Sequence, residues 1–331
     1  MSDASRGGAP RANAGEPAGR GGSPDATRGA GARMELGLVL PQFGPPARGD
    51  DVATRLREVA TRADRLGYGV LWTADHVVFP REITTPYPYG GRFPFPVTEP
   101  ILDPIVGLTC AASVTERVRL GTSVLVLPYR HPVVLAKEIA TLDVLSGGRV
   151  LLGVASGWLR EEFELLGVPF AERGARTDEA IALLRALWSE DSVTFRGRFW
   201  SLDEAVSFPK PVQRPGPPIW IGGSSDAALR RVARRGDGWI AVPRPTLAEL
   251  AHDVERLRRL AEEAGRDPGA LGIASGGSAR SIDELADRMP ELERIGVTIV
   301  SVPVLAWAKS FAHSLELMEE AAARLGARAA G

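Results

Sequence analysis

Apolar and polar residues follow two periods along the chain, one typical of helices and one typical of buried strands. The helical period is plainest between Pro132 and Gly147, where five apolar residues recur at helical spacing: Val134, Leu135, Ile139, Leu142 and Leu145. Proline suits a first helical turn and glycine suits a helix end, so these two residues bound a predicted helix over 131–146. The next segment, 149–155, is apolar after its first residue, which predicts a parallel strand covered on both faces.

Small residues stand at the end of that strand. It finishes in Ala155-Ser156-Gly157, and Trp158 follows. α/β folds bind ligands at the carboxyl ends of their parallel strands, and tiny side chains there leave room for a flat molecule against the backbone. We therefore expect this strand end to form one wall of a binding site.

From Met34 onward the two periods alternate and predict strands separated by helices. The predicted strands are 36–42, 69–74, 119–127, 149–155, 218–223, 238–242, 271–275 and 297–304. The predicted helices lie at about 51–66, from Asp103 onward, and at 131–146, 225–235, 246–264, 281–294 and 307–325. Strands that are each followed by a helix favour an α/β fold of the (β/α)8 TIM-barrel type, and a doubly wound open sheet is the alternative.

Two segments interrupt the repeat. An insertion at about 158–217, after the fourth strand, is predicted to hold helices near 159–165 and 173–189 and a hairpin over 193–200. Loop 76–102, after the second strand, is dense in Pro, Tyr, Phe and Gly. Insertions after barrel strands lie on the face that holds the active site, so the first could cover the pocket or build a dimer contact. Two interpretations stay open for the loop, a wall of the substrate pocket and an inert surface loop.

The first 33 residues differ from the rest in composition. Residues 1–33 are rich in Gly, Ala, Arg, Ser and Pro and nearly lack large apolar residues, which predicts a disordered N-terminal segment. The segment has no apolar run of the kind found in secretory signals. A predicted strand begins directly after Met34, so we expect Met34 to be the true start and 34–331 to be the barrel domain.

Charge and cysteine content narrow the possible partners. The formal net charge is −1, which gives no support for nucleic-acid or anionic-membrane partners. The single cysteine, Cys110, excludes a disulfide framework and a cysteine metal cluster. No apolar run reaches the roughly 18 residues of a membrane span. A cytoplasmic protein with a small-molecule substrate is the expectation.

Few residues at the predicted strand ends can do chemistry. His76 is the one histidine there, beside Asp75, and histidine exchanges protons near neutral pH. We take His76 as the candidate catalytic residue, with a hydrogen-bonded core histidine as the alternative. Gly222-Gly223-Ser224 opens a predicted helix, and the bare backbone N–H groups of such a turn suit a phosphate. A tight turn capped by serine has the same pattern.

Several enzyme classes lack the residues that they require. The chain has no His-x-His pair for a hydrolytic metal, no lysine at a predicted strand end for a Schiff base, and no Gly-x-Ser-x-Gly elbow. Its first strand-to-helix turn also lacks the glycine pattern of dinucleotide-binding folds. The remaining candidates are one histidine, small residues at strand ends and a glycine turn, and such a site suits a bound cofactor that does the difficult chemistry.

Five segments match a known family: LGLVLPQFG, ADRLGYGVLWTADHV, VRLGTSVLVLPYRHPVVLAKEIATLDVLSGGRVLLGVASGW, EEFELLGVPFAERGARTDEAI and PPIWIGGSSDAALRRVARRGDGW. Over about residues 34–305 the chain resembles the luciferase-like monooxygenase superfamily, and within it the branch that uses the deazaflavin coenzyme F-420. The resemblance implies a (β/α)8 barrel with an insertion, commonly a homodimer, that binds FMN or the deazaflavin at the carboxyl face of its strands.

The resemblance also assigns roles to single residues. It implies that Asp75 and His76 face the reactive edge of the cofactor and that Ser123-Val124 forms a non-prolyl cis peptide beneath the ring. The remaining implied cofactor contacts are Ser156, Gly157, Gly222, Gly223 and Ser224. Trp158 stands where the sugar-phosphate dehydrogenases of this branch have a catalytic glutamate. We therefore expect another substrate, with Trp158 lining its pocket or stacking near the cofactor ring as a further cofactor contact.

The resemblance favours coenzyme F-420 over FMN. The deazaflavin has carbon where flavin has its reactive nitrogen, so it passes hydride and reacts poorly with oxygen. The expected function is a deazaflavin-dependent oxidoreductase that moves hydride to or from a small organic substrate. An FMNH2-dependent monooxygenase, acting on an alkanesulfonate-like or ketone substrate, and a flavin-binding protein without turnover are the alternatives.

Overall fold

Parallel strands close into a barrel in the computed structural model, which describes residues 34–88, 90–242, 245–276 and 278–326. The barrel strands, in the order in which they pair, are β1 (Glu35–Val39), β2 (Val70–Thr73), β3 (Arg119–Thr122), β5 (Val150–Ala155), β8 (Ile219–Gly222), β9 (Gly238–Ile240), β10 (Gly272–Ala274) and β11 (Ile299–Val302). β11 pairs with β1 and β3 pairs with β5, so the sheet has no open edge. This closure confirms the (β/α)8 barrel and excludes the open sheet. The predicted disordered segment 1–33 lies outside the described residues.

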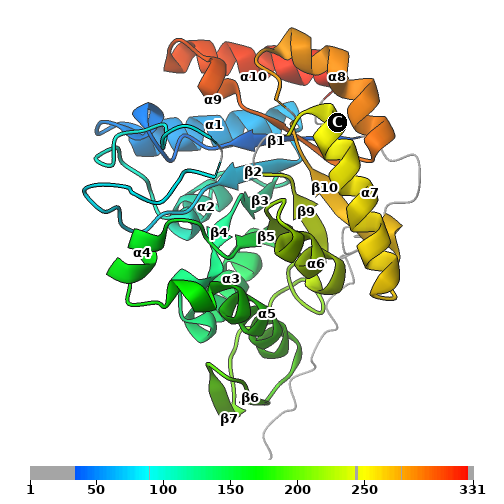
Figure 1. Cartoon of the computed structure of the whole chain (residues 1–331). Helices are drawn as coiled ribbons and strands as arrows, with labels where there is room; N and C mark the ends of the chain where they lie inside the picture. Colours follow the sequence, from blue (N-terminus) through cyan, green and yellow to red (C-terminus); the bar gives the residue numbers. More distant parts are fainter. Residues whose placement is uncertain (1–33, 89, 243–244, 277, 327–331) are drawn as a thin grey trace, which may run out of the picture.

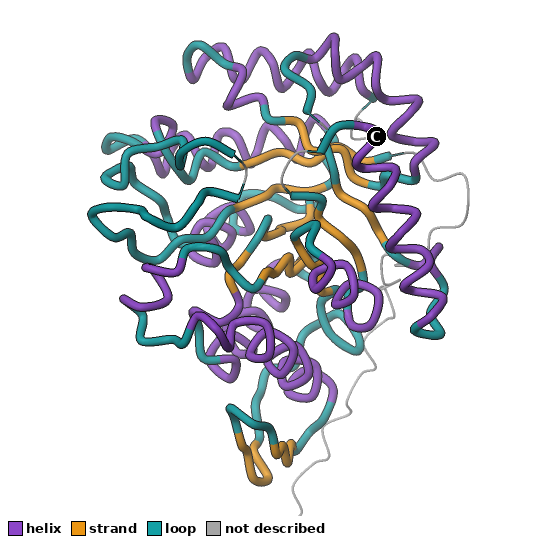
Figure 2. The backbone as a smooth tube through the Cα atoms, viewed as in Figure 1, coloured by secondary structure: helices purple, strands orange, loops and turns teal. Residues whose placement is uncertain are grey.

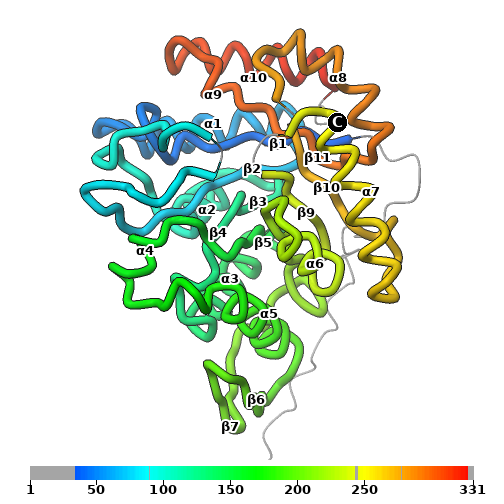
Figure 3. The backbone as a smooth tube through the Cα atoms, viewed as in Figure 1, coloured from blue at the N-terminus to red at the C-terminus, as the bar shows by residue number. Residues whose placement is uncertain are grey.

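Helices surround this barrel (Figure 1). The helices longer than one turn are α1 (Val52–Leu66), α2 (Pro104–Ala112), α3 (Pro132–Ser146), α4 (Arg160–Leu165), α5 (Arg173–Ser189), α6 (Asp226–Arg235), α7 (Leu247–Glu263), α8 (Ile282–Ile295) and α10 (Phe311–Leu325). The last of them, α10, packs against α1 and so completes the ring of helices around the strands (Figure 3). In the part of the chain that the structure describes, no helix combines the length and apolar character that a membrane span requires.

The helix boundaries follow from the local sequence. The Asp103 carboxylate accepts hydrogen bonds from the N–H groups of Ile105 (2.9 Å) and Val106 (3.1 Å), and Pro104 fills the first position of α2. α3 ends at Gly147, which adopts a left-handed conformation that glycine adopts without strain. These ends lie where the sequence predicts them.

Two tryptophans fill the inside of the barrel. Trp72 and Trp220 belong to a buried cluster with the aliphatic residues Val70, Leu151, Ile240, Ala274 and Ile299. Glycines of β3 and β10 make room for the two indoles, because a Cβ atom at Gly121 would stand within 2.5 Å of the Trp72 ring and one at Gly272 within 2.5 Å of the Trp220 ring. Large indoles facing small residues close-pack the interior, so the interior is a core and the ligand site must lie at its mouth.

The third barrel strand departs from its prediction as one strand over 119–127. It divides into β3 and a short β4 (Leu125–Val126), with the cis peptide Ser123–Val124 between them. A single helical turn, Leu127–Tyr129, then leads toward α3. The prediction was wrong here because Leu120 and the run Val124-Leu125-Val126 fit one strand, and Gly121-Thr122-Ser123 between them do not mark the break.

The insertion also differs in detail from the prediction. α5 packs against α3 and α6, so it takes the place of the regular helix between the fourth and fifth barrel strands. What remains as a true addition is α4 and a hairpin of β6 (Val193–Arg196) and β7 (Ser201–Ala205), which projects below α3 and α5 (Figure 2). The hairpin was predicted to end at 200, but its second strand begins only at Ser201. The helix predicted over 307–325 is α10, which begins later, at Phe311, and a single-turn helix, α9 (Val304–Trp307), precedes it.

Candidate active site at the mouth of the barrel

Four strand ends bring the predicted site residues to one mouth, because parallel strands all end on the same face. Close contacts between residues that follow different strands show that these strand ends lie side by side. A Cβ atom on Gly222 would stand 2.7 Å from Val124, and one on Gly157 would stand 2.6 Å from Val126. The ring centroids of His76 and Trp158 are 6.1 Å apart. The residues that follow β2, β3, β5 and β8 therefore form one surface.

The Ser123–Val124 peptide is cis, as the resemblance implied. The Ser123 N–H donates to the Thr73 carbonyl at 2.7 Å, so the interruption stays tied to the end of β2. Val124 then lies against Gly222, which has no side chain to hold it off. The break between β3 and β4 therefore lies directly beside the glycine turn that follows β8.

Asp75 is buried in an ion pair. Arg130 donates to both of its carboxylate oxygens, at 2.7 and 3.0 Å, and the Val126 N–H donates to one of them at 2.9 Å. Burial opposes the charge on Arg130, but its bonds to Asp75 and Asp103 outweigh that effect and raise the pKa of Arg130. The Asp75 side chain thus holds the end of β4 beside β2. Its implied contact with a cofactor stays a prediction.

His76 is held by a buried carboxylate that the sequence analysis missed. Its Nδ1 atom lies 2.7 Å from Oε2 of Glu162, a side chain in α4 with no exposed surface. The Tyr129 hydroxyl donates to the same oxygen at 2.8 Å. An acidic residue in the first turn of a surface-like helix gives no sequence signal of such a contact, because Glu162 and His76 are far apart in the chain.

The surroundings favour a charged Glu162. Burial alone would raise its pKa, but the hydrogen bond and charge of His76, with N–H groups of Val77 and Val78, lower the pKa below its ordinary value. Burial and the charge of Glu162 together raise the pKa of Tyr129, so its hydroxyl remains a donor. The pair of His76 and Glu162 is therefore a proton-exchanging group beside a fixed negative charge.

Loop 76–102 packs over this pair with aromatic side chains. Phe93 lies beside Trp158, with ring centroids 6.2 Å apart and planes nearly parallel, and Tyr87 meets the edge of Trp158 at 5.2 Å. Phe79 lies 4.7 Å from His76. Of the two interpretations of the loop, the structure supports a wall at the barrel mouth. Trp158 belongs to that wall.

Glu161 ties the same loop to α4. Its carboxylate accepts hydrogen bonds from the backbone N–H groups of Thr84 and Thr85, both at 2.8 Å, and from both hydroxyls. Burial opposes the charge, but these bonds together outweigh it and lower the pKa of Glu161 to about 2. Because the folded pKa lies below the ordinary value of 4.5, the contact stabilises the loop above that pH and is lost as the pH falls toward 2.

We expect Glu161→Ala to loosen the loop without unfolding the barrel. The amides of Thr84 and Thr85 lose a charged acceptor, so their hydrogen exchange at pH 7 should speed up by about ten-fold. Exchange read by mass spectrometry on peptides that cover 76–102 measures this. Glu164→Ala, at an exposed position of the same helix, is the control. Equal protection of the loop in both variants would contradict the assignment.

Ser156 presents an unused polar atom at the mouth. Among the described residues its Oγ is one of the few buried side-chain polar atoms without a hydrogen-bond partner. A buried hydroxyl of this kind normally has one, so the atom is free for a ligand. The next residue, Gly157, has φ +82°, and a Cβ there would stand 2.7 Å from Phe163. No other residue fits that position without strain.

The glycine turn after β8 has a fixed backbone. Trp239 donates from its indole N–H to the Gly223 carbonyl at 2.7 Å, and the Ser224 hydroxyl donates to the Val242 carbonyl at 3.2 Å. Gly223 has φ +112°, which excludes other residues. Ser225 caps α6 by accepting from the Ala228 N–H at 3.2 Å. The Ser224 side chain is thus engaged, so any phosphate contact there would fall to backbone N–H groups.

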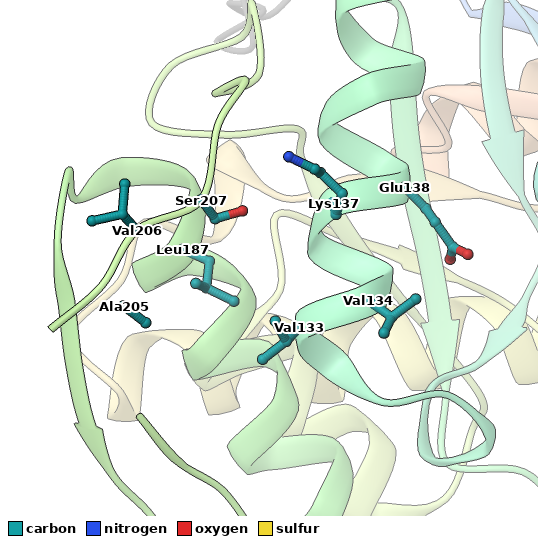
Figure 4. A pocket seen from close by; sticks show the side chains of 8 residues that line it. All are labelled: Val133, Val134, Lys137, Glu138, Leu187, Ala205, Val206 and Ser207. Carbon is teal, nitrogen blue, oxygen red and sulfur yellow. The ribbon is translucent and has the colours of Figure 1, made fainter. Parts of the chain in front are cut away.

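A separate surface cleft lies in the helix layer. It has a volume of about 390 Å³, and Figure 4 shows it between α3, α5 and the segment after β7. Val133 and Lys137 of α3 face Leu187 and Val206 across it. None of its lining residues follows a barrel strand, so it is not part of the mouth. Within the described ranges, no group of three or more His, Cys, Asp or Glu side chains is placed to hold a metal ion.

The fold and the mouth together define a (β/α)8-barrel enzyme. Over residues 34–324 the sequence matches the family model of the luciferase-like monooxygenases, so the chain belongs to that family, whose members are flavin- or deazaflavin-dependent oxidoreductases. An uncharacterized protein of Mycobacterium tuberculosis is 39% identical over 248 residues, 74% of this chain and 83% of that protein. The F420-dependent glucose-6-phosphate dehydrogenase of Amycolatopsis mediterranei is 34% identical over 204 residues, 60% of this chain and 54% of that enzyme.

Solved structures agree on the fold. A monooxygenase of Streptomyces bottropensis superposes with a TM-score of 0.73 at 24% identity, over 88% of this chain and 98% of that one. The F420-dependent tetrahydromethanopterin reductase of Methanopyrus kandleri gives 0.69 at 17%, over 87% and 98%. The oxygenating constituent of 3,6-diketocamphane monooxygenase from Pseudomonas putida, solved with FMN, gives 0.70 at 16%, over 89% and 98%. The luciferase-like barrel is thereby confirmed.

Proposed function

We propose that this protein is a deazaflavin (coenzyme F-420)-dependent oxidoreductase that moves hydride to or from a small organic substrate. The observation that carries the proposal is His76 at the barrel mouth, 2.7 Å from a buried carboxylate. Hydride transfer to or from a carbon–oxygen or carbon–nitrogen bond must be matched by transfer of a proton, and this pair can supply or receive one. The relative named as an F420-dependent dehydrogenase supports the choice of cofactor.

The mouth offers what a flavin-like ring and its phosphate require. Ser156 Oγ is a buried hydroxyl without a partner, and the side-chain-free Gly222 and Gly223 allow close approach of a ligand to the backbone. In this proposal Ser123-Val124, Ser156 and Gly157 would hold the ring, and backbone N–H groups at the N-terminus of α6 would hold the phosphate. The bound cofactor would supply the acceptor or donor of hydride.

Residues of this chain would then control the proton and exclude water. His76 holds or takes up the proton at its ring, and Glu162 keeps the ring in place. The aromatic wall of Phe79, Tyr87, Phe93 and Trp158 presents mostly apolar surface, which suits an uncharged substrate. Trp158 occupies the position of the glutamate used by sugar-phosphate dehydrogenases, so a sugar phosphate is not the proposed substrate.

The second candidate is an FMNH2-dependent monooxygenase. It is favoured by the fold relative that was solved with FMN, and the same strand ends would hold that cofactor. Binding without turnover is a third possibility, and His76→Ala separates it from the first two. Unchanged cofactor affinity, with no turnover in either the wild type or that variant, would favour binding alone.

A cofactor titration tests the proposal directly. We expect purified protein to change the absorbance of added coenzyme F-420 with saturation in the micromolar range and to bind FMN at least about ten-fold more weakly, a difference of about 1.4 kcal/mol. Ser156→Ala should weaken the F-420 affinity, whereas Glu164→Gln should not. Tight binding of FMN with no binding of F-420 would overturn the proposal, and oxygen uptake with reduced FMN would then identify the monooxygenase.

A further inference from the structure

The carboxylate of Glu162 divides its contacts between two sides. Oε1 accepts from the backbone N–H groups of Val77 at 2.7 Å and Val78 at 3.2 Å. Oε2 lies 2.7 Å from His76 Nδ1 and accepts from the Tyr129 hydroxyl at 2.8 Å. The side chain is fully buried, so no water competes for these positions. Each oxygen is therefore fixed to one set of partners.

This arrangement decides which nitrogen of His76 carries the hydrogen. A carboxylate only accepts hydrogen bonds, so the neighbouring Nδ1 must donate. In the neutral ring the lone pair is then on Nε2. No described residue forms a hydrogen bond with Nε2. That nitrogen remains available at the barrel mouth, where Phe79, Phe93 and Trp158 surround the ring.

We propose that Glu162 is the positioning residue of this enzyme, which holds His76 in the tautomer protonated on Nδ1 and so keeps Nε2 ready to take one proton from the substrate. The matching hydride would pass from the substrate to the cofactor of the proposed function, and release of the proton from Nε2 to solvent restores the neutral ring. The catalytic meaning of this step rests on the proposed function. The tautomer itself does not, because it follows from the contacts of Glu162 alone.

A glutamine at this position makes a sharp contrast. The N–H groups of Val77 and Val78 would keep the amide oxygen on their side, because an amide NH2 there would face two donors. The NH2 group would then face His76 and donate to Nδ1. Glu162→Gln is nearly isosteric, yet it should reverse the tautomer and place the hydrogen on Nε2, where it can no longer accept a proton.

Nitrogen-15 NMR of the full chain labelled at histidine tests this without any substrate. The chain has only four histidines, so His76 can be assigned by the loss of its signals in His76→Gln. At a pH where the ring is neutral, we expect the wild-type Nδ1 resonance to be of the protonated type and Nε2 of the unprotonated type. In Glu162→Gln we expect the reverse, with an unprotonated Nδ1 resonance and a protonated Nε2 resonance. A wild-type ring protonated on Nε2 would overturn the inference, as would an unchanged tautomer in Glu162→Gln.

Two further variants guard against a folding artefact. Tyr129→Phe removes a donor to the same oxygen but leaves the carboxylate, so its tautomer should match the wild type. Glu164→Gln changes an exposed carboxylate of the same helix and should also match it. If Glu162→Gln does not fold, the wild-type spectrum still decides. Failure of F-420 to bind would defeat the proposed function alone, since the tautomer is measured without cofactor.

Discussion

Gly153→Ala is expected to destabilise the barrel more than any other single-methyl change in the sheet. A Cβ atom at this position would stand 1.9 Å from the Thr122 carbonyl oxygen and 2.6 Å from the Ile240 side chain. The oxygen belongs to the backbone of β3 and cannot rotate away, so β3 and β5 must separate where they close the barrel. We expect the free energy of unfolding to fall by roughly 3 kcal/mol, the upper range for overpacking a core. Urea unfolding followed by circular dichroism measures it.

Gly107→Ala is the matched control. Gly107 lies within α2, and a Cβ atom there would meet its nearest neighbours, Leu56 and Thr73, at an ordinary 3.9 Å. Alanine costs less conformational entropy than glycine in a helix, so this variant should be neutral or about 0.5–1 kcal/mol more stable. If Gly153→Ala unfolded at the same urea concentration as the wild type, the close approach of β3 to β5 would be wrong.

The sequence predicted the barrel well because its pattern is local and repeated. Apolar strands, first-turn prolines and terminal glycines such as Gly147 each depend on neighbouring residues alone, and apart from the third strand they agree with the structure. The interruption at Ser123-Val124 was invisible to that pattern, since Leu120 before it and Val124-Leu125-Val126 after it fit a single strand. It was expected only through the resemblance, and the structure contains it.

The site could be predicted only in part, for a physical reason. Strand ends are marked by sequence, so His76, Ser156 and Gly222 could be placed at one mouth. The sequence does not mark which residues from distant segments form hydrogen bonds or ion pairs with these strand ends. Glu162 and Arg130 look like surface residues in the sequence, yet Glu162 is buried against His76 and Arg130 against Asp75. Buried charges become recognisable only when the fold shows which opposite charge each one meets.

Arg130→Met should therefore have the second large effect. Arg130 makes two hydrogen bonds to the fully buried Asp75 carboxylate, at 2.7 and 3.0 Å, and one to Asp103 at 2.9 Å. Methionine fills similar volume but leaves that carboxylate with only the Val126 N–H as donor. Removing one partner of a buried pair costs about 3–5 kcal/mol, because the other charge stays buried and uncompensated. Urea unfolding at pH 7 should show a loss of this size.

The double variant Asp75→Asn/Arg130→Met tests the cause. Asparagine keeps an oxygen for the Val126 N–H and removes the charge, so most of the lost stability should return, because a buried ion pair contributes little net stability over a neutral replacement. Arg196→Met breaks an exposed pair with Asp203, in which both side chains are more than half exposed, and should cost less than about 1 kcal/mol. If the double variant were as unstable as Arg130→Met, the loss would come from packing of the Arg130 side chain and not from the buried Asp75 charge.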